Sequence, residues 1–234
     1  MMWCSELITI SGGFRELKSS LKKLIISNCK LGALASGLQC CASLEEFVIW
    51  HWGELIHMND LQELSSLRRL SINRYDKFIK EDCMGNLTQL RELNIGGFSN
   101  ELEAFPVGLV NSFQHPNLSG SLEEVEIYGW DKLKSVPHQL QHLTALKTLK
   151  IWGFNREEFK EALPNRLANL SSLRRLDIVS CKNIKHLPSS TTIQRLSKLE
   201  TLRICECPRE ENCRKEKNGW EWPKISHIPT IIFY

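Results

Sequence analysis

Large apolar residues recur along the chain in a short phrase, L-x-x-L-x-I, whose remaining positions are mostly polar. Within each copy apolar and polar positions alternate, which is the two-residue period of a half-buried β-strand. The pattern predicts eight short strands, one for each copy of the phrase, with Phe47 and Val125 replacing the second leucine in two of them. The copies span residues 21–26, 44–49, 67–72, 90–95, 122–127, 146–151, 173–178 and 199–204.

Between the predicted strands the apolar residues are spaced by three, as in Val136–Leu146 and Leu163–Leu173, which favours short helical or 3-10 turns. Successive phrases begin 23 to 32 residues apart, and most of these intervals are typical of leucine-rich repeats. One repeat cannot bury its own leucines, so neighbouring repeats must stack with their strands parallel. We therefore predict an α/β solenoid, a leucine-rich-repeat horseshoe. Its concave face carries a parallel β-sheet, and its convex face carries short helical or 3-10 turns and loops.

Departures from the repeat divide the chain. Residues 1–20 contain the stub of an earlier repeat and are interpreted as a partial N-terminal repeat, and residues 21–207 as a solenoid of eight repeats. The interval of 32 residues holds many turn-forming residues, which predicts an inserted loop near residues 108–121. The repeat stops after Cys207, and alternating apolar residues in 208–234 predict a capping tail over the last repeat.

The charge balance argues against two classes of partner. The 234 residues include 30 Lys and Arg against 27 Asp and Glu, a formal net charge of +3. Binding to nucleic acids or anionic membranes normally uses a strongly basic field, and no apolar stretch approaches the length of a membrane span. We expect neither nucleic acid nor membrane as a partner.

The cysteines bear on the compartment. The chain has nine, an odd number without a paired pattern, and no basic segment precedes an apolar run at the N-terminus. These features favour reduced thiols in a cytoplasmic protein, and we expect the isolated domain to be a monomer. Three N-glycosylation sequons, at Asn86, Asn117 and Asn169, would matter only in a secreted protein.

Two groups of residues resemble catalytic or metal sites. His138 and His142 have the i, i+4 spacing that shares one helix face, but position 139 is Gln, so the acidic base of a metalloprotease is missing. Cys205, Cys207 and Cys213 lack a fourth ligand at the usual zinc spacing. We expect no catalytic residues, no metal and no cofactor, and therefore no enzyme.

The strand phrases predict a binding surface, because residues between the buried leucines project from the concave sheet. Aromatic side chains at such positions favour protein interfaces, although packing between neighbouring strands would also explain them. Charges of both signs lie beside them, so we expect pairs such as Arg69 with Glu46 to neutralise part of this surface internally. The predicted partner-binding residues are Trp50, Arg69, Asn73, Tyr128, Lys150, Trp152, Arg175 and Arg203.

The tail carries a family resemblance. Residues 207–229, which read CPREENCRKEKNGWEWPKISHIP, resemble the C-terminal end of plant coiled-coil NB-LRR disease resistance proteins, and the irregular repeats resemble the same family over nearly the whole chain. The resemblance implies a domain that recognises a pathogen effector or a guarded host protein and holds the receptor's nucleotide-binding module inactive. The phosphate-binding motif of that module is absent from this chain, so we expect no ATP or ADP binding.

Two other functions stay open at this stage. An extracellular leucine-rich-repeat receptor or secreted inhibitor would suit the sequons, and a glycan at Asn86 or native disulfides would favour it. A substrate adaptor of a ubiquitin ligase would need an adaptor-binding helical module, which the sequence does not show. The leading hypothesis is the recognition domain of a plant immune receptor.

Overall fold

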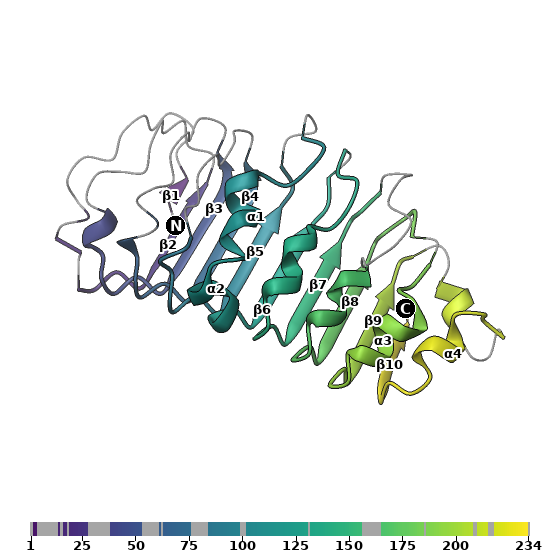
Figure 1. The fold of residues 1–234 in the computed structure, drawn as a ribbon. Coiled ribbons are helices and arrows are strands. Elements are labelled where there is room, and N and C mark those ends of the chain that lie inside the picture. Colours follow the sequence, from purple (N-terminus) through teal and green to yellow (C-terminus); the bar gives the residue numbers. More distant parts are fainter. Residues whose placement is uncertain are drawn as a thin grey trace. The chain divides into compact units, whose positions relative to one another are not determined.

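Figure 1 draws the computed structural model as a ribbon coloured along the sequence. The chain forms two compact units. The first unit comprises residues 1–99 and 105–122, and the second comprises residues 100–104 and 123–234. The described residues are 2–3, 14, 16–17, 19–27, 38–52, 61, 63–75, 84–98, 102–130, 132–155, 165–184, 186–207, 210–214 and 218–233.

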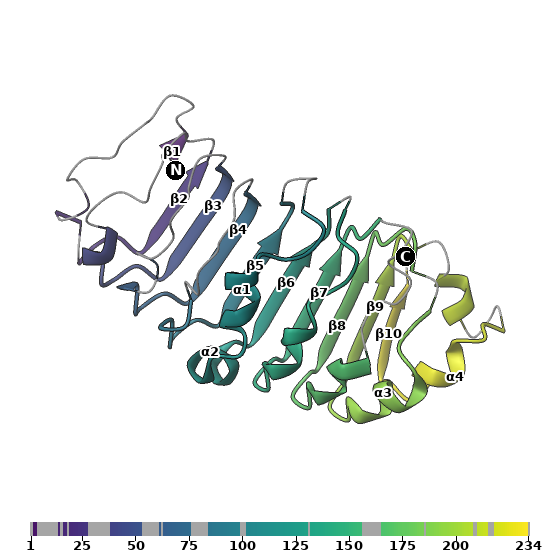
Figure 2. The same cartoon turned by 45° about the horizontal axis from the view of Figure 1, so that its top comes forward.

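The first unit is built on parallel strands that pair in chain order (Figure 2). Two short helices and a 3-10 turn at Leu38–Cys40 belong to the same unit. The strands are β1 (Met2–Trp3), β2 (Lys23–Ser27), β3 (Glu46–Trp52), β4 (Arg69–Tyr75) and β5 (Glu92–Gly96), and the helices are α1 (Val107–Ser112) and α2 (Pro116–Ser121).

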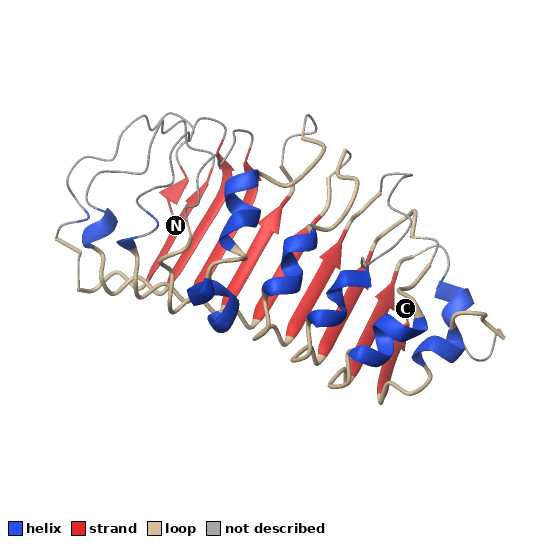
Figure 3. Cartoon of the chain, in the orientation of Figure 1, coloured by secondary structure: helices blue, strands red, loops and turns tan. Residues whose placement is uncertain are grey.

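The second unit repeats this construction. Its strands also pair in parallel and in chain order, and the 3-10 turns His138–His142 and Asn165–Asn169 and the helix α3 (Ser190–Arg195) lie on one side of them (Figure 3). The strands are β6 (Glu124–Tyr128), β7 (Thr148–Trp152), β8 (Arg175–Val179), β9 (Thr201–Cys205) and β10 (Thr230–Phe233). Each of the eight phrases thus forms a strand, as the sequence predicts, from β2 to β9.

The core follows from the register of these strands. In the second unit Leu149 of β7, Leu176 of β8 and Leu202 of β9 are aligned as neighbours, and all three are fully buried. The strand isoleucines form a second aligned row, which is also buried. The first unit shows the same two rows. Stacking of repeats therefore buries the leucine and isoleucine positions of every phrase.

The prediction of a loop at residues 108–121 is wrong, because α1 and α2 occupy this segment. Its apolar residues Leu109, Phe113 and Leu118 are fully buried, so the segment packs into the core of the first unit. Pro116 is at the start of α2, where a proline is compatible with a helix because the first backbone N–H has no partner within the helix. The turn-forming residues thus begin helices here, and the recurrence of large apolar residues every four or five positions is the better signal.

The tail contributes two elements to the second unit. Ile225 of helix α4 (Trp222–Ile225) is buried. Strand β10 pairs in parallel with β9 from Thr230 to Phe233. At the other end of the sequence, the stub at residues 8–10 is outside the described residues. None of the described helices has the length and hydropathy that crossing a bilayer requires.

Gly129 follows β6 at a point where two turns approach closely. A Cβ atom at this position would lie 2.5 Å from the carbonyl oxygen of Gly153, which is backbone and cannot move aside easily. We expect Gly129→Ala to lower the free energy of unfolding by about 1 to 3 kcal/mol, as overpacking does. The matched control is Gly120→Ala in α2, where a Cβ has open space. Equal stability of the two variants in urea melts would contradict the close packing at Gly129.

Candidate functional site

We call the side of each sheet that carries the residues between the buried leucines and isoleucines the open face. In the first unit its charges form a ladder across four strands. Lys23 Nζ lies 2.5 Å from Glu46, and Arg69 lies 3.3 Å from Glu46 and 3.9 Å from Glu92. The hydrogen bond from Lys23 is the main reason why the pKa of Glu46 is lowered. Arg69, a predicted binding residue, therefore belongs to an internally paired ladder.

The open face of the first unit also carries an exposed aromatic side chain. Trp50 is 50% exposed, between its register neighbours Ser27 and Asn73. The Asn73 side chain donates a hydrogen bond to Ser71 Oγ at 2.8 Å. Trp50 is thus available to a partner, whereas one amide donor of Asn73 is already used within the chain.

In the second unit two aromatic rings lie side by side on the open face. Tyr128 of β6 and Trp152 of β7 have ring centroids 6.4 Å apart, and both side chains are half-buried. The Tyr128 hydroxyl donates to Glu126 at 2.8 Å, and burial together with this carboxylate raises the tyrosine pKa, so the hydroxyl stays protonated. Trp152 Nε1 is buried and has no acceptor among the described residues. The pair offers an apolar surface with a donor that the described chain leaves unsatisfied.

Lys150 lies next to this aromatic pair. Its ammonium donates to Glu124 at 2.5 Å. Burial disfavours the charged lysine, but Glu124 above all, and then Glu126 and Asp177, outweigh that effect, so the pKa of Lys150 is raised. The lysine is therefore positively charged at neutral pH.

Arg175 of β8 holds a buried carboxylate. The Asp177 side chain is only 2% exposed, and Arg175 donates to it from Nε at 3.0 and 3.2 Å and from Nη2 at 3.0 Å. A bidentate contact of this kind between a guanidinium group and a carboxylate fixes the orientation of the arginine. Strand alternation puts Asp177 on the outward side, but it gives no sign that this residue orients Arg175.

Arg203 and two of its neighbours complete the open face of the second unit. Arg203 Nε lies 3.2 Å from Cys205 Sγ, and Cys205 itself is buried. Val179, the register neighbour of both Trp152 and Cys205, is buried as well. The expectation that outward positions project into solvent is therefore wrong for Val179 and Cys205, as it is for Asp177, and Val179 has the large side chain of Trp152 as its neighbour.

The structure separates the predicted binding residues into two groups. Trp50, Arg69 and Asn73 lie in the first unit. The other five lie on β6–β9 of the second unit, and they are Tyr128, Lys150, Trp152, Arg175 and Arg203.

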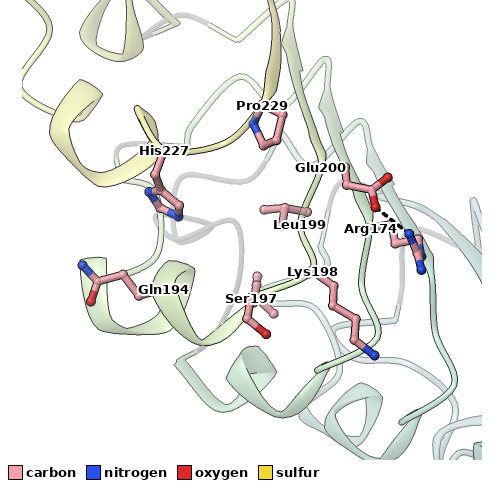
Figure 4. Close-up of a pocket in the computed structure, with 9 residues that line it drawn as sticks. Arg174, Gln194, Ser197, Lys198, Leu199, Glu200, His227 and Pro229 are labelled. Carbon is pink, nitrogen blue, oxygen red and sulfur yellow. Dashed lines mark hydrogen bonds and ion pairs between the residues drawn. The ribbon is translucent and has the colours of Figure 1, made fainter.

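A pocket of about 540 Å³ lies away from these residues, where the turn before β9 meets the segment before β10 (Figure 4). Leu196 and Leu199 supply its apolar surface, and an ion pair between Arg174 and Glu200 with a 2.5 Å contact forms one side. The sequence analysis did not find this pocket, because tail residues such as His227 complete it. The lining residues are Arg174, Gln194, Leu196, Ser197, Lys198, Leu199, Glu200, His227 and Pro229.

The two histidines lie in a 3-10 turn, and Cys181, Cys205, Cys207 and Cys213 are buried. His138 and His142 begin and end a 3-10 turn, and residues four apart do not share a face at three residues per turn. Cys181 is buried, and a hydrogen bond with Cys207 together with burial raises its pKa, which keeps the thiol protonated and unreactive. Within the described part of the chain, no group of three or more His, Cys, Asp or Glu side chains could hold a metal ion.

A protein-family model matches part of the second unit. Residues 132–207 match the family model of the R13L1/DRL21 leucine-rich repeats. This match begins after β6 and ends just beyond β9, so it covers the strands that carry Lys150, Trp152, Arg175 and Arg203. The chain therefore contains a leucine-rich-repeat domain, a type of domain that generally binds other proteins.

Two solved structures of Listeria monocytogenes internalins are similar to the chain. Internalin C2 aligns with a TM-score of 0.56 and 12% sequence identity, over 91% of this chain and 80% of that one. Internalin InlF aligns with a TM-score of 0.49 and 19% identity over 82% of this chain, which spans 56% of the InlF chain. No curated protein sequence matches the chain. The likeness to internalin C2 supports the leucine-rich-repeat solenoid fold.

Proposed function

We propose that this chain is the protein-recognition domain of an intracellular plant immune receptor. In this function it senses a pathogen effector or a guarded host protein, and it contributes to autoinhibition by contacting the receptor's nucleotide-binding module. It is a binding domain without catalysis or cofactor, and it acts in the cytoplasm. The resemblance of residues 207–229 to plant resistance proteins supports this proposal, as does the match to a family model of plant resistance-related leucine-rich repeats.

The observation that carries the recognition function is the aromatic pair on the open face of the second unit. Tyr128 and Trp152 are half-buried on neighbouring strands, Lys150 is held on the same strand as Trp152, and Arg175 is held on the next strand. Aromatic and arginine side chains held in this way commonly supply most of the binding energy of a protein interface. Because their positions are fixed in the free protein, little conformational entropy is lost when a partner binds.

We expect Trp152→Ala to weaken binding of the natural partner by roughly thirtyfold or more, the effect of losing an interface hot spot. The control is Trp130→Ala. Trp130 is buried and donates from Nε1 to the Leu102 carbonyl oxygen at 2.6 Å, so its loss should reduce stability first. Partner affinity is measured by calorimetry and stability by thermal melting. If Trp152→Ala binds like the parent chain and melts as early as Trp130→Ala, the open-face aromatics are structural.

Exposed sequons favour one alternative, an extracellular leucine-rich-repeat receptor or inhibitor. Asn86, Asn117 and Asn169 are all exposed, although Asn117 also donates to the Gly85 carbonyl oxygen and Asn169 to Gln141. Mass spectrometry of the protein from its native tissue distinguishes the two functions. Glycans on these asparagines would support the extracellular function, whereas unmodified asparagines would support the intracellular one.

A further inference from the structure

The open faces of the two units differ in how their charges are distributed. Over β6–β9 the outward residues include three basic and three acidic side chains, 3 − 3 = 0, but two of the acidic residues, Glu124 and Glu126, both lie on β6. On β2–β5 the outward residues Lys23 and Arg69 balance Glu46 and Glu92, a net charge of zero. On β7–β9 the outward residues include three basic side chains and one acidic, which gives 3 − 1 = +2. These nine outward residues are Thr148, Lys150, Trp152, Arg175, Asp177, Val179, Thr201, Arg203 and Cys205.

Burial makes the surface of β7–β9 more basic than this sum suggests. The single acidic side chain, Asp177, is only 2% exposed, whereas the Arg175 side chain is 41% exposed. A partner approaching β8 therefore meets the guanidinium group and not the carboxylate beneath it. Asp177 accepts from Nε and Nη2 of Arg175, so Nη1 points its two N–H donors away from this contact.

The arrangement suits recognition of a carboxylate. A guanidinium group that is already oriented offers parallel N–H donors at the spacing of two carboxylate oxygens, and it loses little side-chain entropy on binding. Arg203 lies on the neighbouring strand, and its Nε contact with Cys205 Sγ holds it beside the same surface. Two cationic groups thus lie on adjacent strands about 4.8 Å apart.

The strand on the other side of β7 from β8 and β9 is β6, and its outward charges are acidic. Glu124 and Glu126 of β6 lie beyond Lys150, and they contact Lys150 and Tyr128. A negatively charged segment would be repelled over β6 and attracted over β8 and β9. The charge pattern therefore sets the direction in which a partner segment crosses the strands.

We propose that the open face of β6–β9 binds an acidic segment of the partner protein, with an apolar side chain against Tyr128 and Trp152 and carboxylates at Arg175 and Arg203. This inference rests on the proposed recognition function and names the chemistry of its partner. Trp152 and Arg203 are two strands apart, a distance of about 10 Å. An extended segment spans this distance in about three residues. The partner segment therefore has an aromatic or aliphatic residue separated by about three residues, in either chain direction, from Asp or Glu.

The test uses three libraries of short fluorescein-labelled peptides, each with one central tyrosine. They differ only in their other variable residues, which are Asp and Glu, Lys and Arg, or Asn and Gln. Binding of the full chain is measured by fluorescence anisotropy at physiological and raised salt. We expect the tightest binders to come from the acidic library and to weaken as salt rises.

Variants then locate the site. Arg203→Gln, and separately the double change Arg175→Gln with Asp177→Asn, should each weaken the best acidic peptide at least about fivefold. The double change removes the charge without leaving Asp177 buried and unpaired, so the fold is retained, as thermal melting checks. The control is Arg174→Gln, which neighbours Arg175 in sequence but pairs with Glu200 beside the separate pocket. It should leave affinity unchanged.

Three results would overturn the acidic-partner inference. One is that no library yields a binder, and another is that the acidic peptides bind equally well to the parent chain and to both open-face variants. The third is that the best peptides are basic or neutral. If such peptides were weakened by Trp152→Ala, the recognition function would stand while the chemistry of its partner would be wrong.

Discussion

Leu176→Ala should lower the free energy of unfolding by about 2 to 5 kcal/mol. Leu176 is fully buried in the middle of the second unit, with Leu149 on one side and Leu202 on the other in the aligned leucine row. Both neighbours belong to strands that are hydrogen-bonded on each side, so they cannot move together to fill the space that the lost side chain leaves. The measurement is urea denaturation followed by circular dichroism.

The control for this substitution is Arg174→Ala. Arg174 is two positions away, its side chain is 54% exposed, and its ion pair with Glu200 is at the surface, where such pairs contribute little. Arg175 is closer in sequence, and its outward position alone suggests a harmless substitution. It is the wrong control, because its loss would leave Asp177 buried and unpaired. Equal losses for Leu176→Ala and Arg174→Ala would mean that the inward and outward assignment is wrong.

The strands were predictable because one repeated phrase defines them. Each repeat has the same inward positions, so eight copies of a two-residue alternation reinforce one another. The segment of α1 and α2 has no such repetition. Its helices depend on burial of Leu109, Phe113 and Leu118 in the folded unit. The prediction of a loop considered only the local turn-forming residues and not this burial.

The candidate site was predictable only as a list of outward positions. Strand alternation placed Tyr128, Trp152 and Arg175 on the open face, and the structure has them there. Alternation says nothing about how far a side chain is covered by those on neighbouring strands. Burial of Asp177 and Val179 depends on the size and charge of residues a whole repeat away, 26 or 27 positions along the chain. The pocket near His227 was missed for the same reason, since it needs the tail to fold back beside β9.

The different arrangement of charges on the two open faces shows how a repeat fold acquires specificity. The buried rows are nearly the same in both units, because stacking requires leucine and isoleucine there. Outward positions carry no such requirement and can differ from strand to strand. In the first unit they form a balanced ladder, and in the second they place Arg175 and Arg203 on the two strands that follow the aromatic pair. The inferred preference for an acidic segment thus resides in residues that the fold leaves free to vary.

Deleting residues 208–234 should make the remaining chain aggregate and lose its cooperative unfolding transition. The deletion removes β10, which pairs with β9 along Thr201–Ile204. An uncovered β9 would present a row of unpaired backbone N–H and C=O groups, which is a template for pairing with other chains. The deletion also removes Ile225 and Ile228, both buried, so apolar surface of the last repeat would become exposed to water. Size-exclusion chromatography and thermal melting measure the two effects.

A point substitution separates loss of coverage from a general sensitivity of the tail. Trp220 lies in the same segment and is 48% exposed, and its ring contacts His186 and Lys224. Trp220→Ser should therefore leave the chain monomeric and its melting nearly unchanged. Ile225→Asp should instead reproduce much of the deletion, because it places a charge where α4 packs against the unit. A monomeric deletion variant that melts like the parent chain would show that the tail does not cap the last repeat. Aggregation of the deletion variant, together with that of Ile225→Asp, would instead trace the effect to the uncovered β9 and to the apolar surface that Ile225 and Ile228 cover.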